Sequence, residues 1–144
     1  MIIRSDPVNA FLDYGDVEVP SAASGPLAGL TFAVKDIYDV AGYPTGDGNP
    51  IRRAESPVHT TTAPIVAAML GAGARFVGKT QTDEMTFSMN GQNKHFPQPI
   101  NPRAEGRISH FPKSWTGLEG NRRYLIRFHN PPSTITCTLP WVTE

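Results

Sequence analysis

The sequence predicts an α/β fold, and three features in the middle of the chain carry that prediction. An apolar run at 30–40, a helical pattern at 60–74 and a second short apolar run at 75–80 follow one another along the chain. A strand, a helix and a second strand in this order form a βαβ unit, whose strands lie parallel and whose crossover is right-handed. We therefore expect a parallel pair of strands that belongs to a mixed sheet.

The length and composition of the chain set the outer limits of this prediction. With 144 residues the chain is long enough for one domain with a hydrophobic core, since single domains commonly have about 100–150 residues. Its 14 prolines and 13 glycines favour loops over long helices. We divide the chain into an irregular lead-in at 1–24, a main region at 25–107 and a divergent tail at 108–144.

Charge and cysteine content limit the expected partners and location. Thirteen basic residues balance 13 acidic ones, so we expect no nucleic acid partner. No apolar stretch approaches the roughly 20 residues that a membrane-spanning helix requires, so we expect no membrane partner either. The single cysteine, Cys137, and a start without a signal-peptide pattern predict a reducing cytoplasm.

The first strand is the clearest element of the unit. In LTFAVK, at 30–35, both alternating sets of side chains are mostly apolar, which is typical of a strand buried on two faces. The segment that follows, 41–59, has Gly, Pro, Asn and Asp at close intervals and no sustained period. We expect a long surface loop there.

The helix and the second strand come next. Pro64 suits a first helical turn, and the apolar residues after it recur at helical spacing until Gly71 and Gly73 end the pattern. RFVGKT, at 75–80, then predicts a short strand. TDEMTFSMN, at 82–90, predicts a helical turn that Thr82 caps, with acidic residues near its positive end.

The residue pattern of the tail differs from that of the main region. RRYLIRF at 122–128 and STITCTLPW at 133–141 each alternate apolar and polar residues, so two short strands around HNPPS form a possible β-hairpin. Nothing in the sequence links this hairpin to the βαβ unit, and we treat the tail as unrelated to it.

The main region resembles the opening of amidase-signature enzymes. The resemblance is carried by GPLAGLTFAVKDIYDVAGYPTGDGNP, at 25–50, and by the run TTTAPIVAAMLGAGARFVGKTQTDEMTFSMNGQNKHFPQPINP, at 60–102, whose motifs occur in the family's order. SMNGQNKH, at 88–95, is most similar to the plant-type indole-3-acetamide hydrolase branch and to its non-catalytic relatives in chloroplast import receptors. The resemblance implies that the chain holds the N-terminal part of one large domain built around a mixed sheet.

The resemblance also implies a reaction, amide hydrolysis, and a residue that acts as the base. Family members hydrolyse amides with a serine nucleophile, a second serine in a cis peptide and a lysine base, and Lys35 falls on the lysine position. Burial in an apolar strand lowers the pKa of a lysine, which suits this role. The strand pattern alone favours a solvated lysine at the end of an edge strand, and the family context favours the base.

The same resemblance suggests where a small-molecule amide would bind. Ser88, Met89, Asn90 and Gly91 are similar to the segment that borders the family's substrate pocket. The competing interpretation is that Met85, Phe87 and Met89 belong to the core. We expect no cofactor and no metal, because the four histidines of the chain show no zinc-like spacing.

The family pattern stops after Arg107. The resemblance implies a glycine- and serine-rich block beyond this point, but Ser109, Ser114 and Ser133 lie in no such block. We therefore expect an amidase-family chain truncated before its catalytic serines and inactive alone, since a lysine without a nucleophile forms no acyl-enzyme. The alternatives are a non-catalytic interaction module with a protein partner, or a remnant without a retained role.

Overall fold

The computed structural model describes residues 6–15, 17–88, 92–100, 127–129 and 134–136. Within them a four-stranded sheet has the order β2-β1-β4-β3. β1 (Thr31–Lys35) pairs in parallel with β2 (Arg75–Thr80), as expected for a βαβ unit. β3 (Arg127–His129) pairs antiparallel with β4 (Thr134–Thr136), so the sheet is mixed and the predicted α/β class is confirmed.

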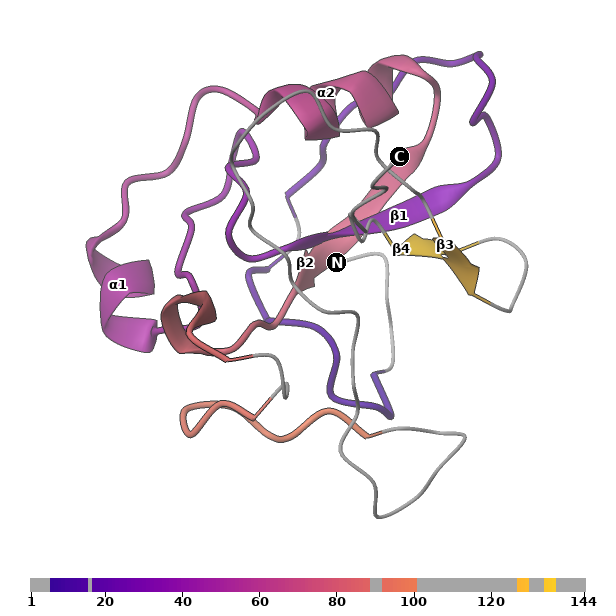
Figure 1. Cartoon of the computed structure of the whole chain (residues 1–144). Helices are drawn as coiled ribbons and strands as arrows, with labels where there is room; N and C mark the ends of the chain where they lie inside the picture. Colours follow the sequence, from indigo (N-terminus) through magenta and orange to yellow (C-terminus); the bar gives the residue numbers. More distant parts are fainter. Residues whose placement is uncertain (1–5, 16, 89–91, 101–126, 130–133, 137–144) are drawn as a thin grey trace, which may run out of the picture.

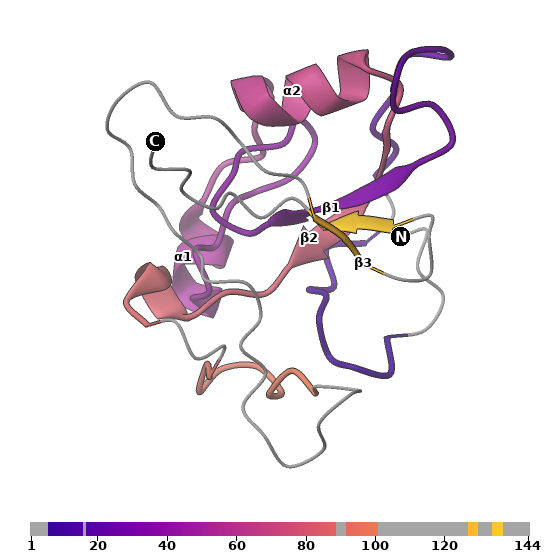
Figure 2. The same ribbon diagram turned by 45° about the vertical axis from the view of Figure 1, so that its right-hand side comes forward.

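Helix α2 (Pro64–Gly71) crosses one face of the β1–β2 pair, as both ribbon views show (Figures 1 and 2). The helix begins with Pro64 at a position where a missing N–H costs nothing. Its buried side chains meet those of both strands in one hydrophobic core. The members of that core are Phe32, Val34, Val40, Tyr43, Val66, Met69, Leu70, Ala74 and Phe76.

The predicted loop at 41–59 contains a short helix that the sequence analysis did not predict. α1 (Pro50–Glu55) begins after Asn49, whose side-chain oxygen accepts hydrogen bonds from the backbone N–H groups of Ile51 and Arg52. None of the helical residues is buried, so no apolar period marks the helix in the sequence. The pair Asn49-Pro50, a capping residue followed by proline, was the available signal.

The turn at 82–90 also differs from the prediction. A single 3-10 turn, η1 (Glu84–Thr86), follows Asp83, which makes no side-chain capping bond. Thr82 was expected to cap, but its hydroxyl is buried and has no hydrogen-bond partner within the part of the chain that the structure describes. The expectation that Met85 and Phe87 belong to the core was wrong as well, since half of Met85 and nearly all of Phe87 are exposed.

The lead-in is irregular but lies against the sheet. Phe11 forms an isolated antiparallel bridge with Thr80. On either side of that bridge, the Leu12 N–H donates to the Lys79 carbonyl and the Gln81 N–H donates to the Ala10 carbonyl, each at 3.0 Å. The lead-in therefore covers the free edge of β2.

The two predicted tail strands are present as β3 and β4. We treated these strands as unrelated to the main region, yet β4 pairs in parallel with β1, from Thr31 opposite Thr134 to Ala33 opposite Thr136. β1 therefore lies between two strands rather than at an edge of the sheet. Among the helices of the described ranges, none has the length and apolar character needed to cross a membrane.

Candidate active site

Lys35 lies at the carboxyl end of β1, where it is in register with Thr80 of β2. The chain turns sharply after it, because the Lys35 carbonyl accepts hydrogen bonds from the N–H groups of Ile37 (2.7 Å) and Tyr38 (3.1 Å). The Lys35 Nζ atom is buried and has no hydrogen-bond partner among the residues that the structure describes. The solvated lysine that the strand pattern alone favoured is therefore not what the structure contains.

The surroundings of Lys35 disfavour its charged form. Its side chain lines a small apolar pocket between β1 and α2, with Phe32, Ile65 and Met69 among the other lining residues. Burial lowers the pKa of Lys35 to about 8, although the nearby carboxylates of Asp83 and Asp47 oppose this shift. A lysine with this pKa is about one-tenth neutral at pH 7, and the neutral amine can accept a proton.

A second buried lysine lies one strand away. Lys79 of β2 is 1% exposed, and its ammonium donates three hydrogen bonds. The acceptors are Asp36 Oδ1 at 2.8 Å, the Pro44 carbonyl at 2.9 Å and Thr45 Oγ1 at 3.0 Å. Because an ammonium group has three donors, every proton of Lys79 is used.

Asp36, directly after Lys35, is the acidic partner in this arrangement and is also 1% exposed. Besides the Lys79 ammonium, its carboxylate accepts hydrogen bonds from the Tyr14 hydroxyl (2.7 and 2.8 Å to its two oxygens) and from the Gly46 N–H (3.2 Å). Burial raises the pKa of Asp36 and lowers the pKa of Lys79, while the attraction between the two charges opposes both shifts. The satisfied donors and acceptors favour the ionised pair.

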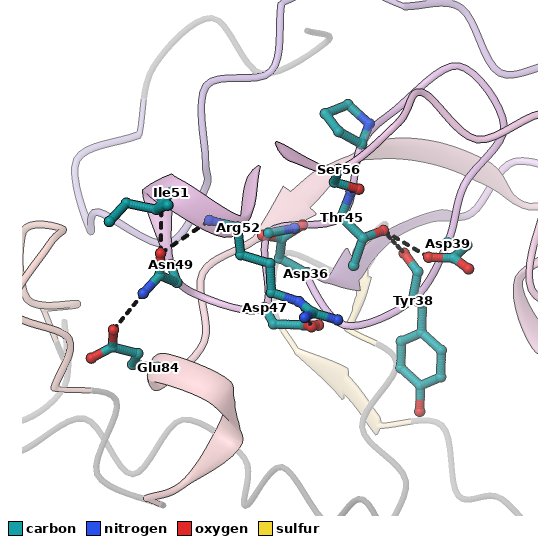
Figure 3. A network of polar contacts seen from close by, with 12 residues as sticks. Asp36, Tyr38, Asp39, Thr45, Asp47, Asn49, Ile51, Arg52, Ser56 and Glu84 are labelled. Carbon is teal, nitrogen blue, oxygen red and sulfur yellow. Dashed lines mark hydrogen bonds and ion pairs between the residues drawn. The ribbon is translucent and has the colours of Figure 1, made fainter. Parts of the chain in front are cut away.

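The loop 43–49 lies over the carboxyl ends of β1 and β2. Figure 3 shows its polar side chains: Thr45 donates to Asp39 (2.8 Å), while Asn49 donates to Glu84 (2.6 Å). Glycine is required at Gly48, where φ is +76° and a Cβ atom would lie 2.7 Å from the Thr82 carbonyl oxygen. The loop and the segment after β2 therefore pack tightly against each other.

Only part of the predicted substrate segment can be located. Ser88 lies shortly after η1 and is half-buried, while Met89, Asn90 and Gly91 lie outside the described residues. Substrate binding by this segment stays a prediction. Just beyond it, the Asn93 side-chain amide donates to the carbonyls of Gly48 (2.6 Å) and Thr82 (2.9 Å) and so ties the segment to the loop.

Sequence reasoning missed the residues around Lys35. Asp36, Lys79 and Tyr14 were not singled out, although Lys79 follows the apolar run Phe76-Val77-Gly78 in the same strand and thereby indicated a buried partner. Two of the histidines, His59 and His95, have carboxylate neighbours. His59 Nε2 lies 3.1 Å from Asp39 Oδ1, and His95 Nε2 lies 3.0 Å from Glu84 Oε1.

Known proteins share most of the described region. The family model described as Amidase matches residues 12–109. A protein of Oryza sativa subsp. japonica named Amidase 1 is 47% identical over 100 residues, which are 69% of this chain and 23% of that protein. The chloroplastic outer envelope protein 64 of Arabidopsis thaliana is 46% identical over 89 residues, which are 62% of this chain and 15% of its own length.

A solved structure shares the fold. It belongs to a vestigial protein complex connected with the evolutionary origins of an s-triazine catabolic enzyme, and it matches with a TM-score of 0.55 and 35% identity. The match covers 59% of this chain and 18% of that chain. This chain therefore spans less than a quarter of the length of these relatives.

Proposed function

The chain belongs to the amidase family, and we propose that it carries the lysine base of an amide-hydrolysing active site. One observation supports this role above all others: Lys35 Nζ is buried at the end of a central strand without an acceptor for its protons in the described part of the chain. Burial lowers the pKa of Lys35 to about 8, so a neutral amine is available near neutral pH. Such an amine can take a proton from a serine hydroxyl that attacks an amide carbonyl.

The proposed reaction converts a carboxylic amide and water into a carboxylate and ammonia. Indole-3-acetamide and simple aliphatic or aromatic amides are the proposed substrates, because the segment 88–95 is most similar to the plant-type branch. Ser88, Met89, Asn90 and Gly91 would border the substrate. The plant relative named Amidase 1 supports this assignment at the level of the family.

We propose that this chain does not complete the reaction alone. The main region contains the lysine, but no segment of the sequence has the glycine- and serine-rich character that the family resemblance implies for the nucleophile and its oxyanion hole. Loss of the nucleophile removes acyl transfer entirely, and loss of one oxyanion donor costs about 100- to 1,000-fold. Lys35 would then act only together with serines from elsewhere.

A chimera tests the role of Lys35 directly. Residues 12–107 of this chain would replace the matching segment of the rice Amidase 1, which supplies the rest of the domain. We expect ammonia release from indole-3-acetamide by the chimera, and at least a ~100-fold loss with Lys35→Met. The matched control is Lys94→Met, because the Lys94 side chain is 74% exposed.

Two results would contradict the proposal. One is a folded Lys35→Met chimera that hydrolyses the amide as fast as the parent chimera. The other is hydrolysis by the isolated 144-residue chain, which would show that a serine of the chain itself acts as nucleophile.

A second candidate is a non-catalytic interaction module built on the amidase scaffold. The similarity to the outer envelope protein 64 of chloroplasts favours it, because this relative matches nearly as much of the chain as the amidase does. A cooperative thermal melt of the chain without amide turnover by the chimera would support it. A cytoplasmic location stays a prediction.

A further inference from the structure

We infer that Asp36 and Lys79 are positioning residues for Lys35, and that their buried ion pair holds the surrounding chain so that the Lys35 amine stays shielded from water. The inference rests on the proposed role of Lys35 as a base. It concerns residues that touch neither the amide nor the serine, and that act through the backbone next to Lys35 and through the loop above it.

The backbone next to Lys35 is fixed by Asp36. The Asp36 N–H donates to the Thr80 carbonyl (3.0 Å), and the Asp36 carbonyl accepts from the Asp47 N–H (2.9 Å). Lys35 lines the pocket beside α2, whereas the Asp36 carboxylate contacts Lys79 and Tyr14, so the two side chains leave the chain in different directions. Because the Asp36 carboxylate is bound on its own side by Lys79, Tyr14 and Gly46, the direction in which Lys35 leaves the chain is fixed as well.

The same pair holds the loop. Lys79 donates to the Pro44 carbonyl and the Thr45 hydroxyl, while Asp36 accepts from the N–H groups of Gly46 and Asp47. Three consecutive loop residues, Pro44 to Gly46, are thus bound to the two side chains, and Asp47 is bound to the backbone carbonyl of Asp36. The loop reaches Lys35 through Asp47, one of the two carboxylates that act on the Lys35 ammonium.

The fit between loop and pair is close enough to transmit a displacement. A Cβ atom on Gly46 would lie 3.0 Å from Asp36 Oδ2, 3.1 Å from the Tyr14 hydroxyl and 2.8 Å from the Arg53 Cβ. A buried ion pair adds little net stability compared with apolar residues of the same volume, because desolvation offsets the attraction. A role in orienting the loop and the end of β1 explains why an ion pair, rather than apolar side chains, occupies this buried position.

A structural role alone and a positioning role make different predictions. If the pair only stabilises the fold, removing it lowers the melting temperature and leaves the pKa of Lys35 unchanged in the folded molecules. If the pair positions the loop and the strand end, water reaches Lys35 when the pair is weakened. The pKa of Lys35 then rises toward its ordinary value of 10.5.

The experiment is an NMR titration of the 144-residue chain labelled with 13C at the lysine Cε atoms. The chain has four lysines, Lys35, Lys79, Lys94 and Lys113, so the signals can be assigned by single substitutions. The variants are Asp36→Asn, which keeps the shape of the side chain, and Tyr14→Phe, which removes one donor to the carboxylate. The control is Glu55→Gln, the same change of charge at an exposed position of α1.

We expect Lys35 to titrate near pH 8 in the parent chain and in Glu55→Gln, and near pH 10 in Asp36→Asn. Such a rise lowers the neutral fraction at pH 7 about 100-fold. Tyr14→Phe should give a smaller rise and decides the question if Asp36→Asn does not fold. An unchanged Lys35 pKa in the folded variants would overturn the positioning role while leaving Lys35 a base. Titration of the parent chain near pH 10.5 would instead overturn the proposed function.

Discussion

Lys35 and Lys79 lie on neighbouring strands, one register step apart, but they differ in the hydrogen bonds that their ammonium groups make. Val34 is the register partner of Lys79, and Lys35 that of Thr80. Both ammonium nitrogens are buried, yet within the described ranges Lys79 donates to three acceptors and Lys35 to none. Burial is therefore a poor guide to the role of a lysine, whereas the number of acceptors around its nitrogen separates a structural cation from a candidate base.

The difference has a chemical consequence. The protons of Lys79 are shared with a carboxylate, a carbonyl and a hydroxyl, so losing one of them breaks a set of hydrogen bonds. Lys35 loses no hydrogen bond to a described residue on deprotonation, and the neutral amine avoids the cost of a buried charge. The following substitutions test this contrast.

The largest expected effect is the loss of stability in Lys79→Met. The change leaves the Asp36 carboxylate buried without its cation, which costs about 3–5 kcal/mol. We would measure the free energy of unfolding in urea by circular dichroism at pH 7. Lys94→Met is the control, and it should change the stability by less than about 0.5 kcal/mol because that side chain is largely exposed. Equal effects of the two substitutions would show that Lys79 is not a structural cation.

A smaller loss is expected for Tyr14→Phe. The Tyr14 hydroxyl donates to a charged acceptor, and removing such a bond costs about 1.5–3 kcal/mol, with the lower end expected for a half-buried tyrosine. Tyr43→Phe provides the comparison, because the Tyr43 hydroxyl donates to the neutral Val17 carbonyl at 2.8 Å. That substitution should cost only about 0.5–1.5 kcal/mol. A ranking with Tyr43→Phe above Tyr14→Phe would argue against an ionised Asp36.

Lys35→Met should increase the free energy of unfolding, in contrast to the two substitutions above. At pH 7 the wild-type lysine is mostly charged and has no acceptor among the described residues, so methionine should raise the stability by about 1–2 kcal/mol. We expect less than the whole pKa shift would give, because part of the side chain remains exposed and solvent screens its charge. Urea unfolding of both proteins at pH 7 measures the difference, and a loss of stability in the variant would contradict the account.

The gain in Lys35→Met should depend on pH. Between pH 8 and 10.5 the unfolded chain keeps the lysine proton that the folded chain has lost, so the stability of the wild type rises with pH in this window. The advantage of the variant should therefore shrink above pH 8 and disappear near pH 10.5. A constant difference from pH 7 to pH 10.5 would mean that the pKa of Lys35 is not lowered in the folded state.

Asp39→Asn should have the smallest effect. Its carboxylate lies beside His59 and accepts from the Thr45 hydroxyl, but its side chain is 48% exposed. Exposed ion pairs contribute about 0–1 kcal/mol, so we expect a change below about 0.5 kcal/mol in urea unfolding. A loss as large as that of Lys79→Met would place the centre of the polar network at Asp39 instead of Asp36.

Local patterns in the sequence predicted the elements that form the core. The apolar runs at 30–35 and 75–80 and the helical spacing after Pro64 correspond to β1, β2 and α2. These elements could be predicted because burial of both faces of a strand, or of one face of a helix, requires apolar residues at a regular spacing in the sequence. Helix α1 buries none of its residues and leaves no such period.

Contacts between distant segments were not predictable in this way. The pairing of β4 with β1 joins residues about 100 positions apart, and no local pattern specifies a strand's neighbour. The ion pair between Asp36 and Lys79 is hidden for the same reason. A lysine in an apolar strand indicates that a partner exists, but the parallel register of β1 and β2 decides which carboxylate it is.

The pKa of Lys35 in the folded chain tests the central claim most directly. In the 13C-lysine NMR titration, we expect the Lys35 signal to change with a midpoint near pH 8. A midpoint of Lys35 near pH 10.5 would contradict the account, because a lysine that stays fully charged at neutral pH is not the base of an amide hydrolase.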